Sequence, residues 1–437
     1  MNLAINLTIF TTILFSHLMA ARPFYLRLRH EEMPSTIHFA TISVIIYYDL
    51  GLGLEALNFP YESNFFISLF SADEKIIIQA FALILFTPWL FALGATLTNK
   101  YTDLVVQEPV ASLKKERQKF FYFITSFISI ALAIFGYRQF SQNPSIWSSR
   151  QQIGETLGPF IILLYLPTCF LGFYVRLTNA KTQFGLLYSL GLTIASILST
   201  FAVGQRNTIL VPLLILTLFR AKINITRITV FVCVGVVAAS ALLPIFKWQY
   251  SDADASILDL VGETINGDFS RSPILKTALE MAEPVGTSVM PYPLAGYVYA
   301  LLYYVPRSIV PFKGWSTAQY FTSELARTPV EDTTWGFGVG AIEEILLNAG
   351  LWLSVPGLIV YGMCMGMLDK LSGRIPSLVV STRLAAIWLC GYDLVSLLIT
   401  FGTMAIISFG FHYLFVQQHL HLSKDRLDRN MSLRKFG

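Results

Sequence analysis

Charged residues are scarce in this chain of 437 residues. Only 13% of its residues are charged and 54% are hydrophobic, whereas a soluble domain carries about 25% charged residues. This composition, with a mean hydropathy of +0.59, excludes a water-soluble globular domain. The apolar runs are continuous over about 20 residues instead of alternating over about 10, which disfavours a membrane β-barrel. The sequence therefore predicts an all-α, polytopic integral membrane protein.

Cysteine and histidine are also few. The four cysteines form no CxxC pair and have no histidine at metal-ligand spacing, so disulfide and zinc frameworks are not supported. No GxxxxGK[ST] motif for nucleotide phosphates is present. We therefore expect no bound metal, nucleotide or other cofactor. The cysteines are Cys169, Cys233, Cys364 and Cys390.

The apolar runs predict about eleven membrane spans. Basic residues are roughly twice as numerous in the loops on one side as on the other, which orients the chain with its N-terminus outside and its C-terminus in the cytoplasm. The basic tail is expected to anchor at the inner leaflet and not to bind nucleic acid. The predicted spans are 2–21, 37–57, 76–97, 120–136, 157–175, 184–203, 208–219, 228–246, 342–368, 379–395 and 399–416.

Four parts follow from this topology: a bundle of about eight spans (1–246), a large outer loop (247–341), about three more spans (342–417) and a basic tail (418–437). The loop is expected to be an ordered, helical domain, with helices over 256–265, 273–282 and 316–326 and with Ser316 as an N-cap. Its tyrosine-rich stretch, 291–305, is interpreted as an interfacial or re-entrant helix. The alternative is a wall on which sugars stack, with Tyr304 as a candidate contact.

Several ionisable residues fall inside predicted spans, where charge is costly and usually paired, and three of them are considered as ion-pair members. They are Asp49, Arg383 and Asp393. We expect buried structural ion pairs, and a proton path is the alternative.

Arg206 lies in Gly204–Asn207, between two apolar spans at the outer surface. A guanidinium there either extends its charged end to the aqueous surface or pairs with an anion. Its planar, forked arrangement of N–H donors suits bidentate hydrogen bonding to a phosphate. The alternatives are a substrate-binding arginine and an arginine that caps a hairpin.

A second basic segment follows the tyrosines. Pro306 and Pro311 restrict the backbone around Arg307 and Lys313, so these two cations are expected to be held in place as an anion clamp. An ordinary solvated loop is the competing interpretation. Arg271 and Arg327 complete the outer basic residues considered for phosphate binding.

Glu344 and Asn348 begin the predicted ninth span, behind a glycine-rich approach, Gly336–Gly340. Residues four apart share one helix face, and glycines let a substrate approach the backbone. A partly desolvated Glu344 is expected to act as a base near neutral pH, or else to pair with Arg206 or Arg307.

The order of these motifs resembles that of the Wzy-type oligosaccharide repeat-unit polymerases of bacterial surface polysaccharides. The shared features are G-x-R between spans, a late outer loop, P-R-x-x-x-P-x-K, and a glycine-rich approach to E-x-x-x-N-x-G. Members usually read K-P after the basic loop, whereas Gly314 follows Lys313 here, and Leu346 replaces an aromatic residue. The fold is similar to that of multi-span glycosyltransferases with lipid-linked donors.

The resemblance implies a glycosyltransferase of the bacterial inner membrane, independent of metal and nucleotide. It would transfer a growing glycan from undecaprenyl pyrophosphate to another undecaprenyl-pyrophosphate-linked repeat unit at the periplasmic face. Its partners would be that lipid-linked oligosaccharide, membrane lipid, a chain-length regulator and a flippase.

The chemistry assigns roles to these residues. Arg206 and Arg307 would stabilise the departing pyrophosphate, and Glu344 would be the base, because every histidine maps to the inner half or the cytoplasmic side. Lys313, Arg271, Arg327, Asn348 and Tyr304 are the candidate substrate-binding residues. A flippase or exporter of the same lipid-linked unit is one alternative. An O-antigen ligase is another, disfavoured by the missing outer histidine.

Overall fold

The computed structural model consists of helices, turns and loops wherever it is described. The described residues fall into two compact units. Unit 1 is formed within Met1–Asp103, Ser240–Lys370 and Thr382–Phe401, and unit 2 within Leu104–Ala239, Leu371–Ser381 and Gly402–Gly437. The structure describes residues 3–30, 32–57, 66–98, 165–177, 183–202, 210–218, 270–282, 290–303, 305, 308–333 and 336–411, with scattered positions between 123 and 138.

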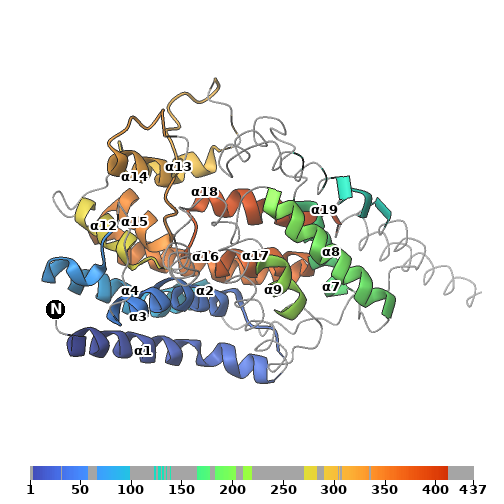
Figure 1. The fold of residues 1–437 in the computed structure, drawn as a ribbon, viewed down its shortest axis with the longest axis horizontal. Helices are drawn as coiled ribbons and strands as arrows, with labels where there is room; N and C mark the ends of the chain where they lie inside the picture. The colour runs from blue at the N-terminus through green and yellow to red at the C-terminus, as the bar shows by residue number, and fades with distance from the viewer. Residues whose placement is uncertain are drawn as a thin grey trace, which may run out of the picture. The chain divides into compact units, whose positions relative to one another are not determined.

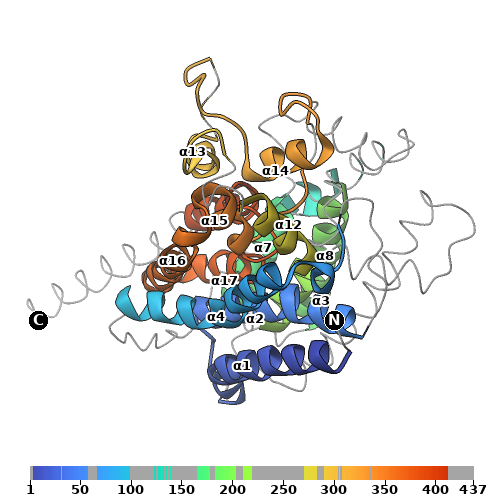
Figure 2. The ribbon, with the colours of Figure 1, turned by 90° about the vertical axis from the view of Figure 1, so that its left-hand side faces the viewer.

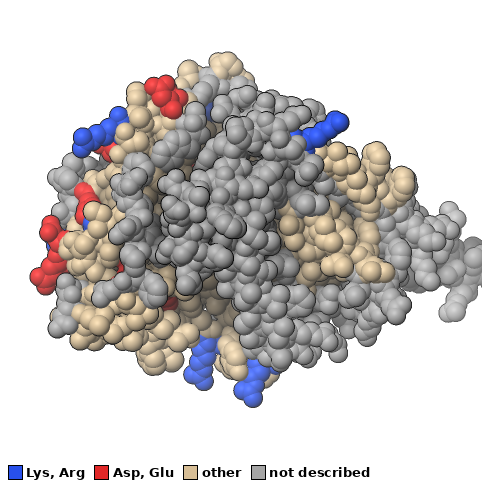
Figure 3. Space-filling model, viewed as in Figure 1, with Lys and Arg blue, Asp and Glu red and all other residues tan. Residues whose placement is uncertain are grey.

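Four helical segments in the described residues are long and apolar enough to cross a membrane. The first three coincide with the predicted spans at 2–21, 37–57 and 76–97, whereas the total of eleven stays a prediction. Figure 3 shows the charged side chains of the described residues mostly at the rim of the visible face. The four segments are α1 (Leu3–Arg29), Thr36–Ala56, α4 (Glu74–Thr98) and Leu351–Arg374.

The expected span 342–368 is divided in two. Helix α15 (Ala341–Ala349) ends at Gly350, which has a φ of 77°, and a 3-10 turn leads into α16 (Ser354–Arg374). A positive φ stops a right-handed helix and suits glycine. Hydropathy does not detect this break, because apolar residues continue through it.

The expected span 379–395 is also interrupted. Helix α17 (Val379–Ile387) is followed by an irregular segment, 388–393. The chain becomes helical again at α18 (Leu394–Leu397), where the Asp393 side chain accepts a hydrogen bond from Ser396 N and acts as the N-cap. A π-helical turn (Leu398–Gly402) then leads into α19 (Thr403–Phe411). Among the described residues Asp393 is therefore a helix cap, whereas a buried ion pair was expected.

The second spanning segment contains a π-helical turn (Ile45–Asp49) between α2 (Thr36–Val44) and α3 (Leu50–Ala56). Its last three residues contact three different parts of unit 1. The Tyr47 carbonyl accepts from Arg271 N at 2.9 Å, Tyr48 donates to Glu343 at 2.6 Å, and Asp49 contacts His17 at 2.8 Å. π-Helical turns frequently occur at functional sites, and this one organises the buried polar groups of unit 1.

His17 joins three spanning segments through both ring nitrogens. Nδ1 lies 2.8 and 2.9 Å from the two oxygens of Asp49, and Nε2 lies 3.0 Å from the Ile84 carbonyl in α4. That carbonyl lacks its helical donor, because the residue four positions later is Pro88, which has no N–H. A carbonyl only accepts, so Nε2 carries a hydrogen. His17 thus compensates a hydrogen bond that Pro88 removes.

We expect His17→Leu to destabilise the protein by about 3–5 kcal/mol, because it leaves the buried Asp49 without its partner. The double variant His17→Leu with Asp49→Leu should regain most of the loss, since the buried charge is gone. Thermal unfolding in detergent measures both. A double variant less stable than the single one would contradict this account of the pair.

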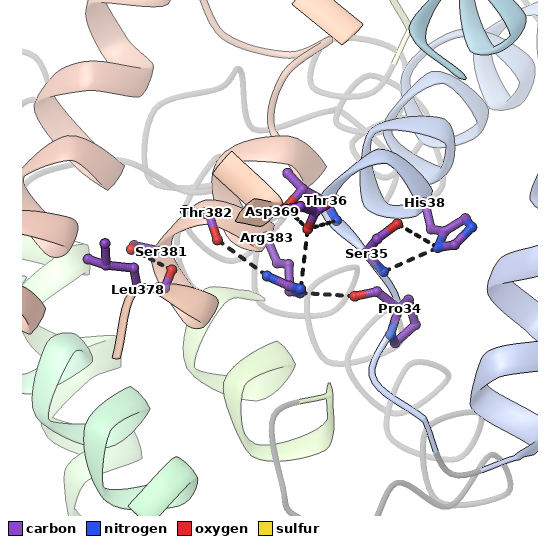
Figure 4. A network of polar contacts seen from close by, with 9 residues as sticks. All are labelled: Pro34, Ser35, Thr36, His38, Asp369, Leu378, Ser381, Thr382 and Arg383. Carbon is purple, nitrogen blue, oxygen red and sulfur yellow. Dashed lines mark hydrogen bonds and ion pairs between the residues drawn. The ribbon is translucent and has the colours of Figure 1, made fainter. Parts of the chain in front are cut away.

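A second buried pair joins the start of α2 to the end of α16 (Figure 4). The Asp369 carboxylate accepts from Thr36 N at 2.7 Å and from its hydroxyl at 2.6 Å, and it lies 3.3 Å from Arg383 Nη2. Arg383 Nε also donates to the Pro34 carbonyl at 2.9 Å. The expected structural pairing of Arg383 is confirmed, with Asp369 as a partner that the sequence did not indicate.

The expected outer loop contributes helices to unit 1. The predicted helix at 273–282 is α12 (Ser272–Ala282), and the one at 316–326 is α14 (Thr317–Ala326), capped by Ser316 as predicted. The tyrosine-rich stretch contains the short helix α13 (Ala295–Leu301). The helix expected over 256–265 lies outside the described residues. A shared apolar core packs these helices against α15: Phe66, Ile274, Ala278, Met290, Ala295, Phe321, Val339 and Leu347.

Unit 2 is built around α7 (Leu166–Leu177), which packs on α8 (Gln183–Ala202), α9 (Leu210–Leu218) and α19. The Thr168 and Ser196 hydroxyls form a buried hydrogen bond between α7 and α8, and Tyr174 packs edge-on against Tyr188 at 5.0 Å. The candidate site residues that the structure describes lie in unit 1.

Candidate active site

Two consecutive glutamates, Glu343 and Glu344, begin α15, and both side chains are almost fully buried. Consecutive helical residues point about 100° apart, so the two carboxylates have different surroundings. Both lie in the first helical turn, where the helix dipole favours negative charge.

Glu344 is held by three neighbouring elements. Its Oε2 accepts from the Leu394 amide at 2.9 Å and from the Tyr361 hydroxyl at 3.1 Å, and its Oε1 accepts from the Thr317 hydroxyl at 3.2 Å. Within the described residues these hydrogen-bond partners are hydroxyls and an amide. Arg206 and Arg307, its alternative expected partners, lie outside the described residues. Burial, and after it the Asp393 carboxylate, raises the pKa of Glu344 to about 8. Glu344 can therefore gain or release a proton near neutral pH.

Asn348 lies one turn after Glu344 on the same face, as predicted, and its side chain ties α13 and α14 to α15. Nδ2 donates to the Thr317 hydroxyl at 2.9 Å and to the Glu344 carbonyl at 2.8 Å. Oδ1 accepts from the Gly296 amide at 2.8 Å. A Cβ at Gly296 would collide with Thr317 and Asn348, so only glycine allows this approach. Asn348 positions the elements around Glu344.

Two tyrosine hydroxyls lead from Glu344 towards α13. The Tyr361 hydroxyl contacts Glu344 and lies 3.5 Å from that of Tyr297. Both tyrosines are partly exposed, whereas Glu344 is 1% exposed. The hydroxyls therefore link a buried carboxylate to less buried positions.

The contacts of Glu343 hold α15 against a neighbouring element. It accepts from Tyr48 at 2.6 Å and from the Gly340 amide at 2.9 Å, which closes the first turn of α15 onto the π-helical turn. Burial raises its pKa.

Arg271 is buried between the glycine-rich segment before α15, 336–340, and the irregular segment 388–393, which interrupts a predicted span. Nη1 donates to the Gly338 carbonyl at 2.6 Å and Nη2 to the Gly391 carbonyl at 2.7 Å. The guanidinium lies 5.7 Å from the centre of the Tyr47 ring, and no described residue accepts from Nε. The Ala341 amide also donates to the Leu389 carbonyl at 3.0 Å, so the two segments meet directly. We name this arrangement the Arg271 crossing.

At Tyr47, the Arg271 crossing contacts the middle of a helical segment that is long and apolar enough to span a membrane. Thr36–Ala56 has 21 residues, or about 30 Å of helix, and Tyr47 lies close to its midpoint. Irregular backbone at such depth is tolerated only where its polar groups are paired inside the protein or line an aqueous cavity. The Arg271 guanidinium supplies hydrogen-bond donors to two backbone carbonyls of these irregular segments, those of Gly338 and Gly391.

The other candidate basic residues have different surroundings. Lys313 is buried, and its ammonium donates to the carbonyls of Val305, Tyr303 and Leu302 at 2.6, 3.2 and 3.4 Å, after the end of α13. It also lies 5.4 Å from the Tyr299 ring centre. A cation here suits the helix C-terminus. Arg327 is exposed and ends α14 with a φ of 52°. Arg206, Arg307 and Tyr304 lie outside the described residues.

Sequence reasoning missed three neighbours of Glu344: Thr317, Tyr361 and Asp393. The sequence identifies Asp393 only as a charged residue inside a predicted span. Tyr361 lies inside an apolar run and belongs to no motif. The chain turns between α15 and α16, which places Tyr361 beside Glu344. A helix break predicted at Gly350 would have indicated this contact. Among the described residues, no three His, Cys, Asp or Glu side chains are grouped so that they could hold a metal ion.

Comparison of the chain with known proteins gives no relative: no family model, curated protein or solved structure matches it.

Proposed function

We propose that this protein polymerises lipid-linked oligosaccharide repeat units at the periplasmic face of a bacterial inner membrane. The growing glycan would leave undecaprenyl pyrophosphate and join the non-reducing end of a second lipid-linked unit. The observation that carries the proposal is the environment of Glu344, a buried carboxylate with a pKa of about 8 that accepts from the Tyr361 hydroxyl, which in turn lies 3.5 Å from the Tyr297 hydroxyl. The order of the sequence motifs supplies the substrate class.

In the proposed reaction, an acceptor sugar hydroxyl attacks the anomeric carbon of the donor. A C–O bond forms there, and the bond to the pyrophosphate oxygen breaks, with its electron pair leaving on the pyrophosphate. Because Glu344 is buried, the hydroxyl proton passes to the Tyr361 oxygen while Tyr361 transfers its own proton to Glu344 Oε2. General base catalysis of this kind contributes about 10²–10⁴ in rate.

The direct test uses the purified protein in detergent with a defined undecaprenyl-pyrophosphate oligosaccharide. The proposal predicts a ladder of products, each longer by one repeat unit, without added metal or nucleotide. A preparation that stays folded and makes no ladder from the matching repeat unit would argue against the polymerase.

Arg206→Ala and Arg307→Ala are each expected to abolish long-chain polymer, because both are proposed to stabilise the departing pyrophosphate. Loss of such a donor costs about 10²–10³ in rate. Gels of surface polysaccharide from strains that carry each variant measure chain length, and membrane immunoblots measure the amount of protein. Wild-type chain lengths would show that these arginines have another role.

The Arg271 crossing favours a second candidate, a flippase or exporter of the same lipid-linked unit. Discontinuous helices that meet near the middle of a membrane are common in secondary transporters, where they form the substrate site. Reconstituted vesicles distinguish the two functions. A transporter moves the lipid-linked unit across the bilayer without lengthening it, whereas the polymerase lengthens it without moving it.

A further inference from the structure

Helix α13 and the loop that follows it expose several large apolar side chains outside the four spanning segments. We call residues 290–313 the α13 loop. Leu301 is 78% exposed, Ile309 69% and Phe312 71%. Figures 1 and 2 show this part of the chain extending away from α15 and α16, the helices beside it in unit 1. Large apolar side chains exposed together in one loop are candidates for contact with a protein, a ligand or a membrane.

Two contacts hold the loop in shape. The Tyr292 hydroxyl donates to the Phe312 carbonyl at 3.3 Å, which joins the two ends of the loop. Lys313 binds three carbonyls after α13, so its ammonium is withdrawn from the surface. Between Met290 and Phe312 the sequence contains one charged residue, Arg307. The exposed surface of the loop is thus apolar, with little charge.

The loop lies beside a helix whose own surface is suited to lipid. The hydroxyls of Tyr297 in α13 and Tyr361 in α16 are 3.5 Å apart. On the same spanning segment as Tyr361, Trp352 is 82% and Val360 54% exposed, as expected of side chains that face acyl chains. Helix α13, the first part of the loop, therefore adjoins a helix with exposed apolar side chains.

We propose that the α13 loop lies in the boundary between lipid headgroups and acyl chains, where Leu301, Ile309 and Phe312 contact lipid. Tyrosines are enriched at this depth because their rings are apolar and their hydroxyls polar, and the loop contains Tyr292, Tyr297, Tyr299, Tyr303 and Tyr304. A surface nearly without charge suits the acyl boundary better than a soluble or polar partner.

This contact places lipid next to Tyr297 and, through Tyr361, near Glu344. One consequence rests on the proposed polymerase: the polyprenyl chain of a substrate would approach Glu344 sideways, along the α13 loop. The lipid contact itself does not depend on that function.

The test places a single cysteine at Ile309 or at Phe312, in a chain whose four native cysteines are replaced by alanine, and attaches a fluorophore that responds to its environment. Glu331, which is exposed and precedes α15, is the matched control position. The labelled proteins are reconstituted in vesicles of phosphatidylethanolamine and phosphatidylglycerol that contain nitroxide lipids. Emission at Ile309 and Phe312 should be quenched by the nitroxide lipids and protected from aqueous iodide, with the opposite result at Glu331.

Quenching by iodide alone at Ile309 and Phe312 would overturn the proposal, because the loop would then lie in water. Protection from both quenchers would also overturn it, in favour of a protein partner or a second copy of the chain. The measurement needs no enzyme activity, so it can fail while the polymerase stands, and it can succeed if the chain transfers no sugar.

Discussion

Replacing Glu344 by glutamine should abolish chain growth while leaving the protein folded. The amide keeps an oxygen that accepts from the Leu394 amide and the Tyr361 hydroxyl, and Thr317 can rotate its hydroxyl hydrogen to suit the new NH2 group. Glutamine cannot take the proton of an acceptor hydroxyl. We expect the rate of polymer synthesis to fall by about 10²–10⁴, measured with purified lipid-linked repeat units.

Glu343→Gln is the matched control. Glu343 is the neighbouring buried carboxylate, but its contacts are Tyr48 and the first turn of its own helix. Its loss should lower stability and leave the folded fraction active. Full activity of Glu344→Gln, or equal loss in both variants, would show that Glu344 is not the specific proton acceptor.

Replacing Arg271 by methionine should cause a large loss of stability. The carbonyls of Gly338 and Gly391 would lose their charged donor in a buried place, and each such acceptor costs about 1–3 kcal/mol when unpaired. Two together are a large share of a typical stability of about 5–15 kcal/mol. Arg271→Lys should be intermediate, because one ammonium cannot reproduce the fork of a guanidinium.

The control for this series is Arg327→Met, since Arg327 is exposed. Thermal unfolding in detergent should rank the wild type and Arg327→Met highest, then Arg271→Lys, then Arg271→Met. If Arg271→Met unfolds at the wild-type temperature, the Arg271 crossing does not hold the two irregular segments together.

Local signals predicted much of the helical structure. Ser316 was expected to cap α14, because its hydroxyl can accept from an amide three residues later, and it does so from Gln319. Glu344 and Asn348 share a face because residues four apart always do in a helix. Three continuous apolar runs form helices long enough to span a membrane, because about 20 consecutive apolar residues are enough to specify such a helix.

Breaks and distant contacts were not predicted. Gly350 ends α15 inside an apolar run, and hydropathy does not report backbone angles. No distinctive residue pattern marks the π-helical turn at Ile45–Asp49, so the sequence does not predict it. Asp369 meets Thr36 across 333 positions of sequence. The sequence predicts that Lys313 clamps an anion, because it does not show the carbonyls to which the ammonium donates in the structure.

The most direct measurement of the central claim is the initial rate of chain growth by the purified protein as a function of pH. Glu344 accepts a proton as a carboxylate, so with a pKa of about 8 its active fraction grows as pH rises through that value. The same ionisation weakens the fold between the ordinary pKa of 4.5 and about 8, so the folded fraction is measured at each pH. The account predicts a rate that increases about tenfold per pH unit below pH 8 and then levels. No chain growth at any pH, or a rate independent of pH in this range, would contradict it.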